Sequence, residues 1–163
     1  MIHLEKNFMI MQIKTSYFYQ IRNFTPNLIP VSICITDPDW YRPPRGKEYY
    51  IDKRGIICGL RYEPLIVQKN IIYNCPCENK QLLQGQCDFM KQYKDLLNTV
   101  NFEKVIKAFN YCIKLFSLPF DDKETVIVLM LYETPNNPCS ERLIIQEYFN
   151  NHGIECKELE YPI

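Results

Sequence analysis

The sequence feature that most constrains the fold is an apolar run at residues 125–132, TVIVLMLY. A run of this length is typical of a strand that is buried on both faces, as in a parallel sheet. A polar loop follows the run, and a segment with helical periodicity follows the loop. We therefore expect this loop at the carboxyl end of a buried strand and at the amino end of a helix. Open α/β sheets bind their ligands there, and free backbone N–H groups can hold an anion.

The remaining elements are consistent with a small α/β sheet that is at least partly parallel. Alternating or apolar segments predict strands over 10–18, 28–35 and 154–159, the last of them charged enough to be an edge strand. Helical periodicity predicts helices over 89–100 and 102–116, and a third from Cys139 or Ser140 to Gly153, the expected left-handed C′ residue. Residues 47–87 are broken by Gly, Pro and Asn, and they are interpreted as an irregular, cysteine-containing insertion with one hairpin.

Length and charge set limits on the function. A chain of 163 residues suits one domain, over 1–163, with 1–9 as a loose extension because Met9 and Met11 are alternative starts. The formal net charge is zero, which gives no electrostatic footprint for non-specific nucleic-acid binding. The amino-terminal residues lack the pattern of a signal peptide, and the apolar runs are too short to span a bilayer. We therefore expect a cytoplasmic protein without a membrane partner.

Three loops are expected to converge at one edge of the sheet, because each follows a predicted strand. The side chains that they offer as candidate site residues are Ser16, Tyr17, Asp37, Trp40, Glu133, Cys139, Ser140, Glu141 and Arg142. Trp40 is the only tryptophan, and it is interpreted either as a lid over the sheet edge or as a surface that stacks on a ligand.

Three of these residues are candidates for catalysis. Glu133 is a candidate general base or an acceptor for a ligand hydroxyl or amine. Arg142, in the first helical turn, is a candidate to bind a phosphate or carboxylate. Cys139, near the positive end of the helix, is a candidate nucleophile with a lowered pKa, although no histidine is placed to activate it. The alternatives are that Arg142 pairs with Glu133 or Glu141 and that Ser140 only caps the helix.

The cysteines leave two interpretations open. Cys58, Cys75, Cys77 and Cys87 either bind a structural zinc or are free thiols, and free thiols are favoured because two matched Cys-x2–4-Cys pairs are absent. No metal ligand is assigned. The sequence also lacks a Gly-rich phosphate loop, a His-Glu-x-x-His motif and the Rossmann glycine fingerprint, so familiar dinucleotide binding is disfavoured and the cofactor is left open.

The strand 126–133 followed by Asn137-Pro138-Cys139 and Arg142 resembles the DUF488 proteins. Their hallmark is an apolar strand that ends in a Tyr-Glu-like pair, followed by a Cys-His-Arg element that opens a helix. Here Ser140 and Glu141 stand where a single His is usual. The resemblance implies a single compact Rossmann-like α/β domain with a mostly parallel sheet flanked by helices. It carries over Glu133, Cys139 and Arg142 as site positions and implies no particular reaction.

The leading hypothesis is a small domain that binds a nucleotide or other anionic small ligand at the loop 133–142. An extended version of this hypothesis is that the domain also processes the ligand. One alternative is a non-enzymatic protein-interaction module that uses Trp40, Tyr41 and the Pro-rich loop after them. Another is a nucleic-acid accessory protein, whose basic residues would be Arg42, Arg45, Lys47, Lys53 and Arg54. The oligomeric state and the question of whether the protein is an enzyme stay open.

Overall fold

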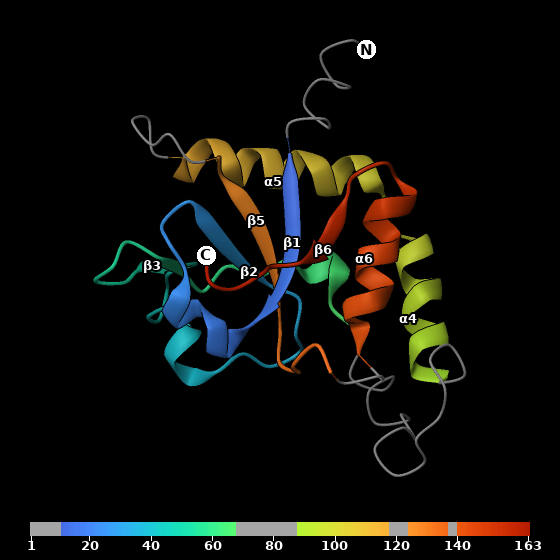
Figure 1. Cartoon of the computed structure of the whole chain (residues 1–163), viewed down its shortest axis with the longest axis horizontal. Coiled ribbons are helices and arrows are strands. Elements are labelled where there is room, and N and C mark those ends of the chain that lie inside the picture. The colour runs from blue at the N-terminus through green and yellow to red at the C-terminus, as the bar shows by residue number, and fades with distance from the viewer. Residues whose placement is uncertain (1–10, 68–87, 118–123, 137–139) are drawn as a thin grey trace.

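A four-stranded parallel sheet forms the centre of the protein (Figure 1). The structure is a computed structural model that describes residues 11–67, 88–117, 124–136 and 140–163. The strands are β1 (Gln12–Tyr17), β2 (Leu28–Ser32), β5 (Val126–Leu131) and β6 (Cys156–Glu158), in the order β2-β5-β1-β6. Each neighbouring pair is parallel. The predicted α/β fold with a mostly parallel sheet is therefore confirmed, and the predicted apolar run is β5, whose six residues are all buried.

Three helices cover one face of the sheet: α4 (Asp88–Asn98), α5 (Phe102–Phe116) and α6 (Glu141–Asn151). Ile13, Ile127 and Leu129 of the strands pack in the same apolar core as the buried sides of these helices. Asn101 caps α5 by accepting a hydrogen bond from the Lys104 N–H, at 3.2 Å. Gly153 follows α6 with a φ of 87°, as its predicted place in the C′ position requires.

Among the described residues, the opposite face is covered by short turns and one hairpin rather than by α-helices. It carries the 3-10 turns η1 (Phe18–Asn23) and η2 (Asp39–Tyr41), and the hairpin of β3 (Tyr50–Ile51) and β4 (Ile57–Cys58). Val128 and Met130 of β5 belong to the core on this side. A third turn, η3 (Glu63–Leu65), follows the hairpin. One hairpin is thus present in the region predicted as irregular, while residues 68–87 of that region lie outside the described residues.

Both edges of the sheet have hydrogen-bonding neighbours. At the β2 edge, Ser32 N–H donates to Leu60 O at 2.8 Å, and Tyr62 N–H donates to Ser32 O at 3.1 Å. At the β6 edge, the side-chain amide of Asn150 accepts from Cys156 N–H at 2.8 Å and donates to Cys156 O at 3.3 Å. The Asn150 amide therefore makes the two hydrogen bonds at Cys156 that the backbone of a further strand would otherwise make on the outer side of β6.

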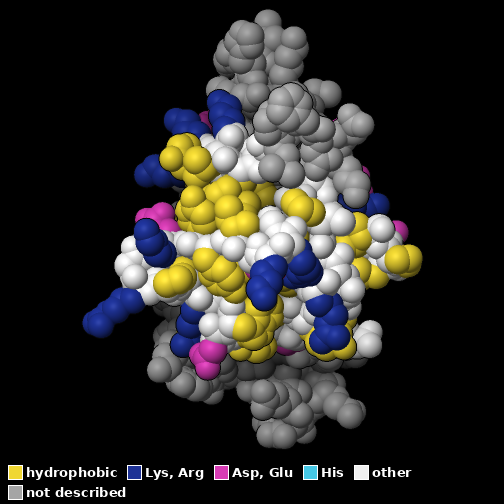
Figure 2. All heavy atoms as spheres, turned by 90° about the vertical axis from the view of Figure 1, so that its left-hand side faces the viewer, with side chains coloured by type: hydrophobic (Ala, Val, Ile, Leu, Met, Phe, Trp, Pro, Cys, Tyr) yellow, Lys and Arg dark blue, Asp and Glu magenta, His cyan; other side chains and the backbone are white. Residues whose placement is uncertain are grey.

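The outer surface on the β2 side is rich in apolar side chains. Figure 2 shows them as a broad area on this face, with Lys and Arg side chains around and across it. Across the described ranges, the helices are all too short or too polar to cross a membrane.

Candidate functional site

The carboxyl ends of β1 and β5 define the centre of the candidate site. The two strands are neighbours in the sheet, but the chain leaves β1 toward β2 and leaves β5 toward β6, on opposite sides. Ligands of open α/β sheets bind at such a switch point. Because β2, β5 and β1 are adjacent and parallel, the loops that follow them share one edge of the sheet, as the sequence predicted.

The carboxyl groups of Glu133 and Glu141, called here the carboxyl pair, meet at this edge. Glu141 opens α6 and is only 5% exposed. Burial, the negative charge of Glu133 and a hydrogen bond with the Glu133 carboxyl raise the pKa of Glu141 to about 8. One oxygen of Glu133, Oε2, is buried and has no hydrogen-bond partner among the described residues. Glu141 therefore keeps its proton near neutral pH, and Glu133 keeps one acceptor oxygen for another group.

Arg142 fixes the loop that carries Glu133. Its side chain is buried, and its Nη2 and Nη1 donate to the main-chain oxygens of Glu133 and Thr134, at 2.6 and 3.0 Å. Its Nε donates to Glu158 Oε1 at 2.7 Å, and Thr15 Oγ1 donates to the same oxygen. Each guanidinium nitrogen thus already binds a protein oxygen, so Arg142 joins the end of β5 to β6. Its role as an anion ligand stays a prediction.

Ser140 caps α6, which confirms the structural role expected for it. Its hydroxyl accepts from Arg142 N–H at 3.1 Å. The Glu141 carboxyl also accepts a hydrogen bond from its own backbone N–H. This bond lowers the pKa of Glu141, but burial and the charge of Glu133 raise it by more. The first amides of α6 are therefore used by the protein's own oxygens.

The loop after β2 brings a second buried carboxylate to this edge. Asp37 accepts a hydrogen bond from Ser32 Oγ and forms an ion pair with Arg61 Nη1 at 2.8 Å. Beside it, the Cys34 thiol donates to Met130 O at 3.4 Å. Burial, together with the charges of Glu141, Glu133 and Asp37, raises the pKa of Cys34 well above its usual range. Cys34 is therefore a neutral thiol, and its electrostatic contacts show that the loops after β2 and β5 converge.

Ser16 and Tyr17 end β1 at the same edge. Ser16 Oγ lies 2.5 Å from the Tyr161 hydroxyl, and burial raises the pKa of Tyr161 to about 12. The Tyr17 hydroxyl accepts a hydrogen bond from Gln20 Nε2 at 2.8 Å. Ser16 is buried and fixes the C-terminal segment, whereas Tyr17 is half-buried and reaches solvent.

Two exposed aromatic rings lie at the ends of β2 and β5. Trp40 is 51% exposed and Tyr132 is 54% exposed. Their ring centroids lie 6.4 and 5.4 Å from that of the buried Phe18, which follows β1. Trp40 also meets the buried Tyr41, at 6.2 Å. Trp40 therefore covers part of the edge and also presents a ring surface to solvent, so both interpretations of it stay open.

The basic residues predicted for nucleic-acid binding are partly paired with carboxylates. Arg42 lies 3.2 Å from Asp39, and Arg54 lies 2.9 Å from Asp52. The three others are exposed: Arg45, Lys47 and Lys53. The two ion pairs weaken the positive potential that a nucleic-acid strand would meet.

The described residues contain no group of three or more His, Cys, Asp or Glu side chains arranged to hold a metal ion. Cys58 is buried, and burial raises the pKa of its thiol. Cys75, Cys77, Cys87 and Cys139 lie outside the described residues. The zinc interpretation and the nucleophile interpretation of Cys139 therefore stay predictions.

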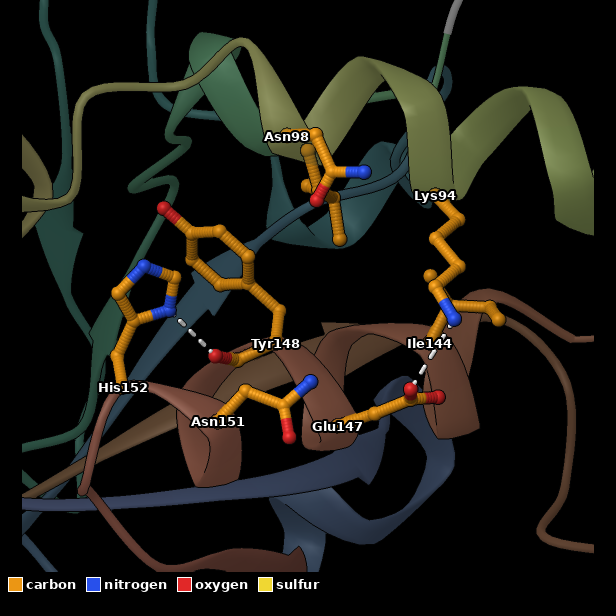
Figure 3. Close-up of a pocket in the computed structure, with 8 residues that line it drawn as sticks. Lys94, Asn98, Ile144, Glu147, Tyr148, Asn151 and His152 are labelled. Atoms are coloured by element: carbon orange, nitrogen blue, oxygen red, sulfur yellow. Dashed lines mark hydrogen bonds and ion pairs between the residues drawn. The ribbon is translucent and has the colours of Figure 1, made fainter.

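Two of the hollows on the described surface adjoin α-helices, away from the carboxyl pair. One, of about 210 Å³, is mostly apolar and lies between α5 and the chain beside β2, where it includes Arg61. The other, of about 90 Å³, lies between α4 and α6 (Figure 3), with an ion pair of 3.2 Å between Lys94 and Glu147 at its margin. His152, which also lines this second hollow, follows the carboxyl end of α6 and so lies toward the opposite edge of the sheet. Neither hollow is lined by a candidate site residue.

Sequence reasoning missed three residues of the site: Glu158, Cys34 and Tyr132. Glu158 ends β6, so the rule that ligands meet the carboxyl ends of parallel strands would have found it if applied to the fourth strand. Tyr132 directly precedes Glu133, but its apolar neighbours indicated a strand residue. For Cys34 there was no local signal, since its contact to Met130 joins positions 96 residues apart.

No protein-family model, curated protein or solved structure matches this chain. The resemblance to the DUF488 proteins stays a prediction from the sequence, and the proposals below depend on the geometry of the site.

Proposed function

We propose that the protein binds, and by acid–base chemistry processes, a small ligand that donates hydroxyl or amino hydrogen bonds at the carboxyl edge of β1 and β5. The observation that carries this proposal is the carboxyl pair, in which Glu141 is buried beside Glu133 and Glu133 Oε2 has no described partner. A buried acceptor without a partner costs about 1–3 kcal/mol, and a ligand that donates to it removes that cost.

The pair suits proton transfer because of its pKa. With its pKa raised to about 8, Glu141 holds a proton at neutral pH and can give it up at a small cost in free energy. Two carboxyl groups in one site commonly divide the roles of acid and base. Ser140, Arg142 and Glu158 fix the backbone on both sides of the pair, which supports a constant geometry.

A nucleotide meets these demands through its sugar hydroxyls and its base amino groups. The phosphate is supported less well, because Arg142 and the first amides of α6 already bind protein oxygens. Asp37 and the carboxyl pair also make the edge acidic, although Asp37 is paired with Arg61. We therefore expect the uncharged part of such a ligand to contribute most of the affinity.

A thermal-shift screen tests the proposal. The probes are nucleosides, nucleoside monophosphates, neutral sugars, simple amines and inorganic phosphate, applied to the wild type, to Glu133→Gln and to Glu147→Gln. Glu147 is an exposed residue on α6, so Glu147→Gln makes the same chemical change outside the site. Turnover of any bound probe is followed by proton NMR.

At least one nucleoside, sugar or amine is expected to raise the melting temperature of the wild type and of Glu147→Gln, and to lose this effect in Glu133→Gln. If no probe shifts the wild type, or if Glu133→Gln responds as the wild type does, the carboxyl pair is not a ligand site. A shift with inorganic phosphate alone would favour the anion site predicted from the sequence instead.

A further inference from the structure

The exposed aromatic rings at the same edge carry information about the class of ligand. Trp40, Tyr132 and Phe18 follow β2, β5 and β1, which are three adjacent strands. Phe18 is 4% exposed and contacts both of the other rings, each of which is more than half exposed. Two exposed rings that share one buried neighbour at a switch point form a local aromatic surface, and apolar surfaces of this kind mark ligand-binding sites.

The exposed rings are held in fixed orientations. The Trp40 ring stands at 87° to Phe18 and at 88° to Tyr41, and the Trp40 carbonyl accepts a hydrogen bond from the Tyr50 hydroxyl. Tyr132 stands at 62° to Phe18. Edge-to-face contacts of this kind immobilise a ring while leaving much of its surface accessible. A flat ligand that stacks there would therefore lose little free energy to the ordering of these side chains.

Tyr132 joins the aromatic side of this edge to the carboxyl pair. Tyr132 and Glu133 are consecutive, and their Cα atoms are separated by about 3.8 Å. Met130 packs on the side of the 3-10 turns and Leu131 on the side of the α-helices, so continued alternation places Tyr132 with Phe18 and Glu133 with α6. A ligand that stacks on Tyr132 can thus donate a hydrogen bond to Glu133 across the end of β5.

We propose that Trp40 and Tyr132 form the stacking side of this site, and that its ligand is a nucleoside-type molecule: a flat heteroaromatic ring that bears a hydroxylated sugar. The inference rests on the proposed function of the carboxyl pair and specifies its ligand class. Base–aromatic stacking accepts any base, while the carboxyl pair selects for donor groups on the sugar. The ion pair of Asp39 with Arg42 leaves little positive charge beside Trp40 for a long polyanionic strand.

Because Trp40 is the only tryptophan, its fluorescence reports directly on ring stacking. The wild type is titrated with purine and pyrimidine nucleosides, with free ribose and with a short single-stranded oligonucleotide. The variants are Tyr132→Leu, Glu133→Gln and the control Tyr111→Leu, since Tyr111 is 68% exposed on α5 and lies outside the site. Trp40→Leu, which lacks the reporter, is measured by calorimetry, and circular dichroism confirms that each variant folds.

A nucleoside is expected to quench Trp40 in a saturable manner, and ribose is not. Loss of one stacking ring is expected to weaken binding about tenfold in Tyr132→Leu and in Trp40→Leu. Glu133→Gln is expected to weaken it as well, and Tyr111→Leu to bind as the wild type does.

Four outcomes overturn the inference. If a sugar or amine binds through Glu133 without quenching and Trp40→Leu binds it equally well, the proposed function stands and the ring assignment fails. If the oligonucleotide binds far more tightly than any nucleoside, with a steep salt dependence, the rings serve a nucleic-acid strand. If Trp40 emission changes only with protein concentration, the rings form a contact between protein molecules. If no probe gives a response in either assay, the proposed function fails too.

Discussion

Replacing Glu141 with glutamine is expected to stabilise the protein at neutral pH and to flatten the dependence of its stability on pH. The pKa of Glu141 is raised from 4.5 to about 8, so between these values the folded protein keeps a proton that the unfolded chain releases. The contribution of Glu141 to the free energy of unfolding is therefore fully present below pH 4.5. It falls as the pH rises and reaches its minimum above pH 8. Each pH unit costs about 1.4 kcal/mol, so at pH 7 the loss is roughly 3 kcal/mol.

The Glu141→Gln substitution avoids this loss because the glutamine amide is uncharged at every pH. The NH₂ group of the new side chain can donate to Glu133 as the protonated carboxyl does. The Glu141→Gln variant is thus expected to match the wild type near pH 4.5 and to exceed it by up to roughly 3 kcal/mol at pH 7. Burial also raises the pKa of Glu158, so a smaller slope in the same direction is expected to remain.

The measurement is urea-induced unfolding at half-unit steps from pH 4.5 to pH 8.5, followed by Trp40 fluorescence and by circular dichroism. Glu147→Gln, on the exposed side of α6, is the matched control and is expected to follow the wild type within about 0.5 kcal/mol. The raised pKa of Glu141 is refuted if wild-type stability stays level over this range, or if Glu141→Gln loses stability with rising pH as steeply as the wild type.

Three further changes test contacts in the site and in the packing of α4 beside it. Arg142→Ala leaves the partly buried Glu158 carboxylate without its cation and is expected to cost about 3 kcal/mol in urea unfolding, whereas a loss under about 1 kcal/mol would show that the loop is held by other contacts. Ser140→Ala removes the cap of α6 and is expected to cost about 1 kcal/mol, with Ser140→Thr near neutral; equal losses in both variants would argue against a capping role. Tyr93→Phe removes the buried hydrogen bond to Leu65 O and is expected to lower the free energy of unfolding by about 1–2 kcal/mol, so an unchanged midpoint would mean that this oxygen finds another donor.

The elements of the fold were predictable because local patterns determine them. Helical periodicity predicted 102–116, and α5 spans Phe102–Phe116. The apolar run predicted 125–132, and β5 spans Val126–Leu131. Because the strands are parallel, the loops that follow β1, β2 and β5 lie at one edge of the sheet. The loop after β5 carries Glu133 and leads to Glu141, so both residues were expected at this edge.

The partners within the site were not predictable, because they depend on contacts between distant segments. A Glu in the first turn of a helix is usually solvated and stabilised by the helix dipole, but packing in the tertiary structure buries Glu141 beside Glu133. Arg142 pairs with Glu158 of β6, a strand whose place in the sheet becomes clear only from the order β2-β5-β1-β6. The half exposure of Trp40 likewise results from its packing on Phe18 and Tyr41.

The amide of Asn150 has a consequence for how copies of this chain meet. A sheet edge with unpaired N–H and C=O groups can recruit a strand from a second molecule and begin ordered aggregation. Here Asn150 already satisfies both groups of Cys156, and the chain at Leu60 and Tyr62 satisfies those of Ser32 on the other edge. At both positions an incoming strand would have to displace an intramolecular bond before forming its own, so these contacts act as built-in protection against polymerisation through the sheet.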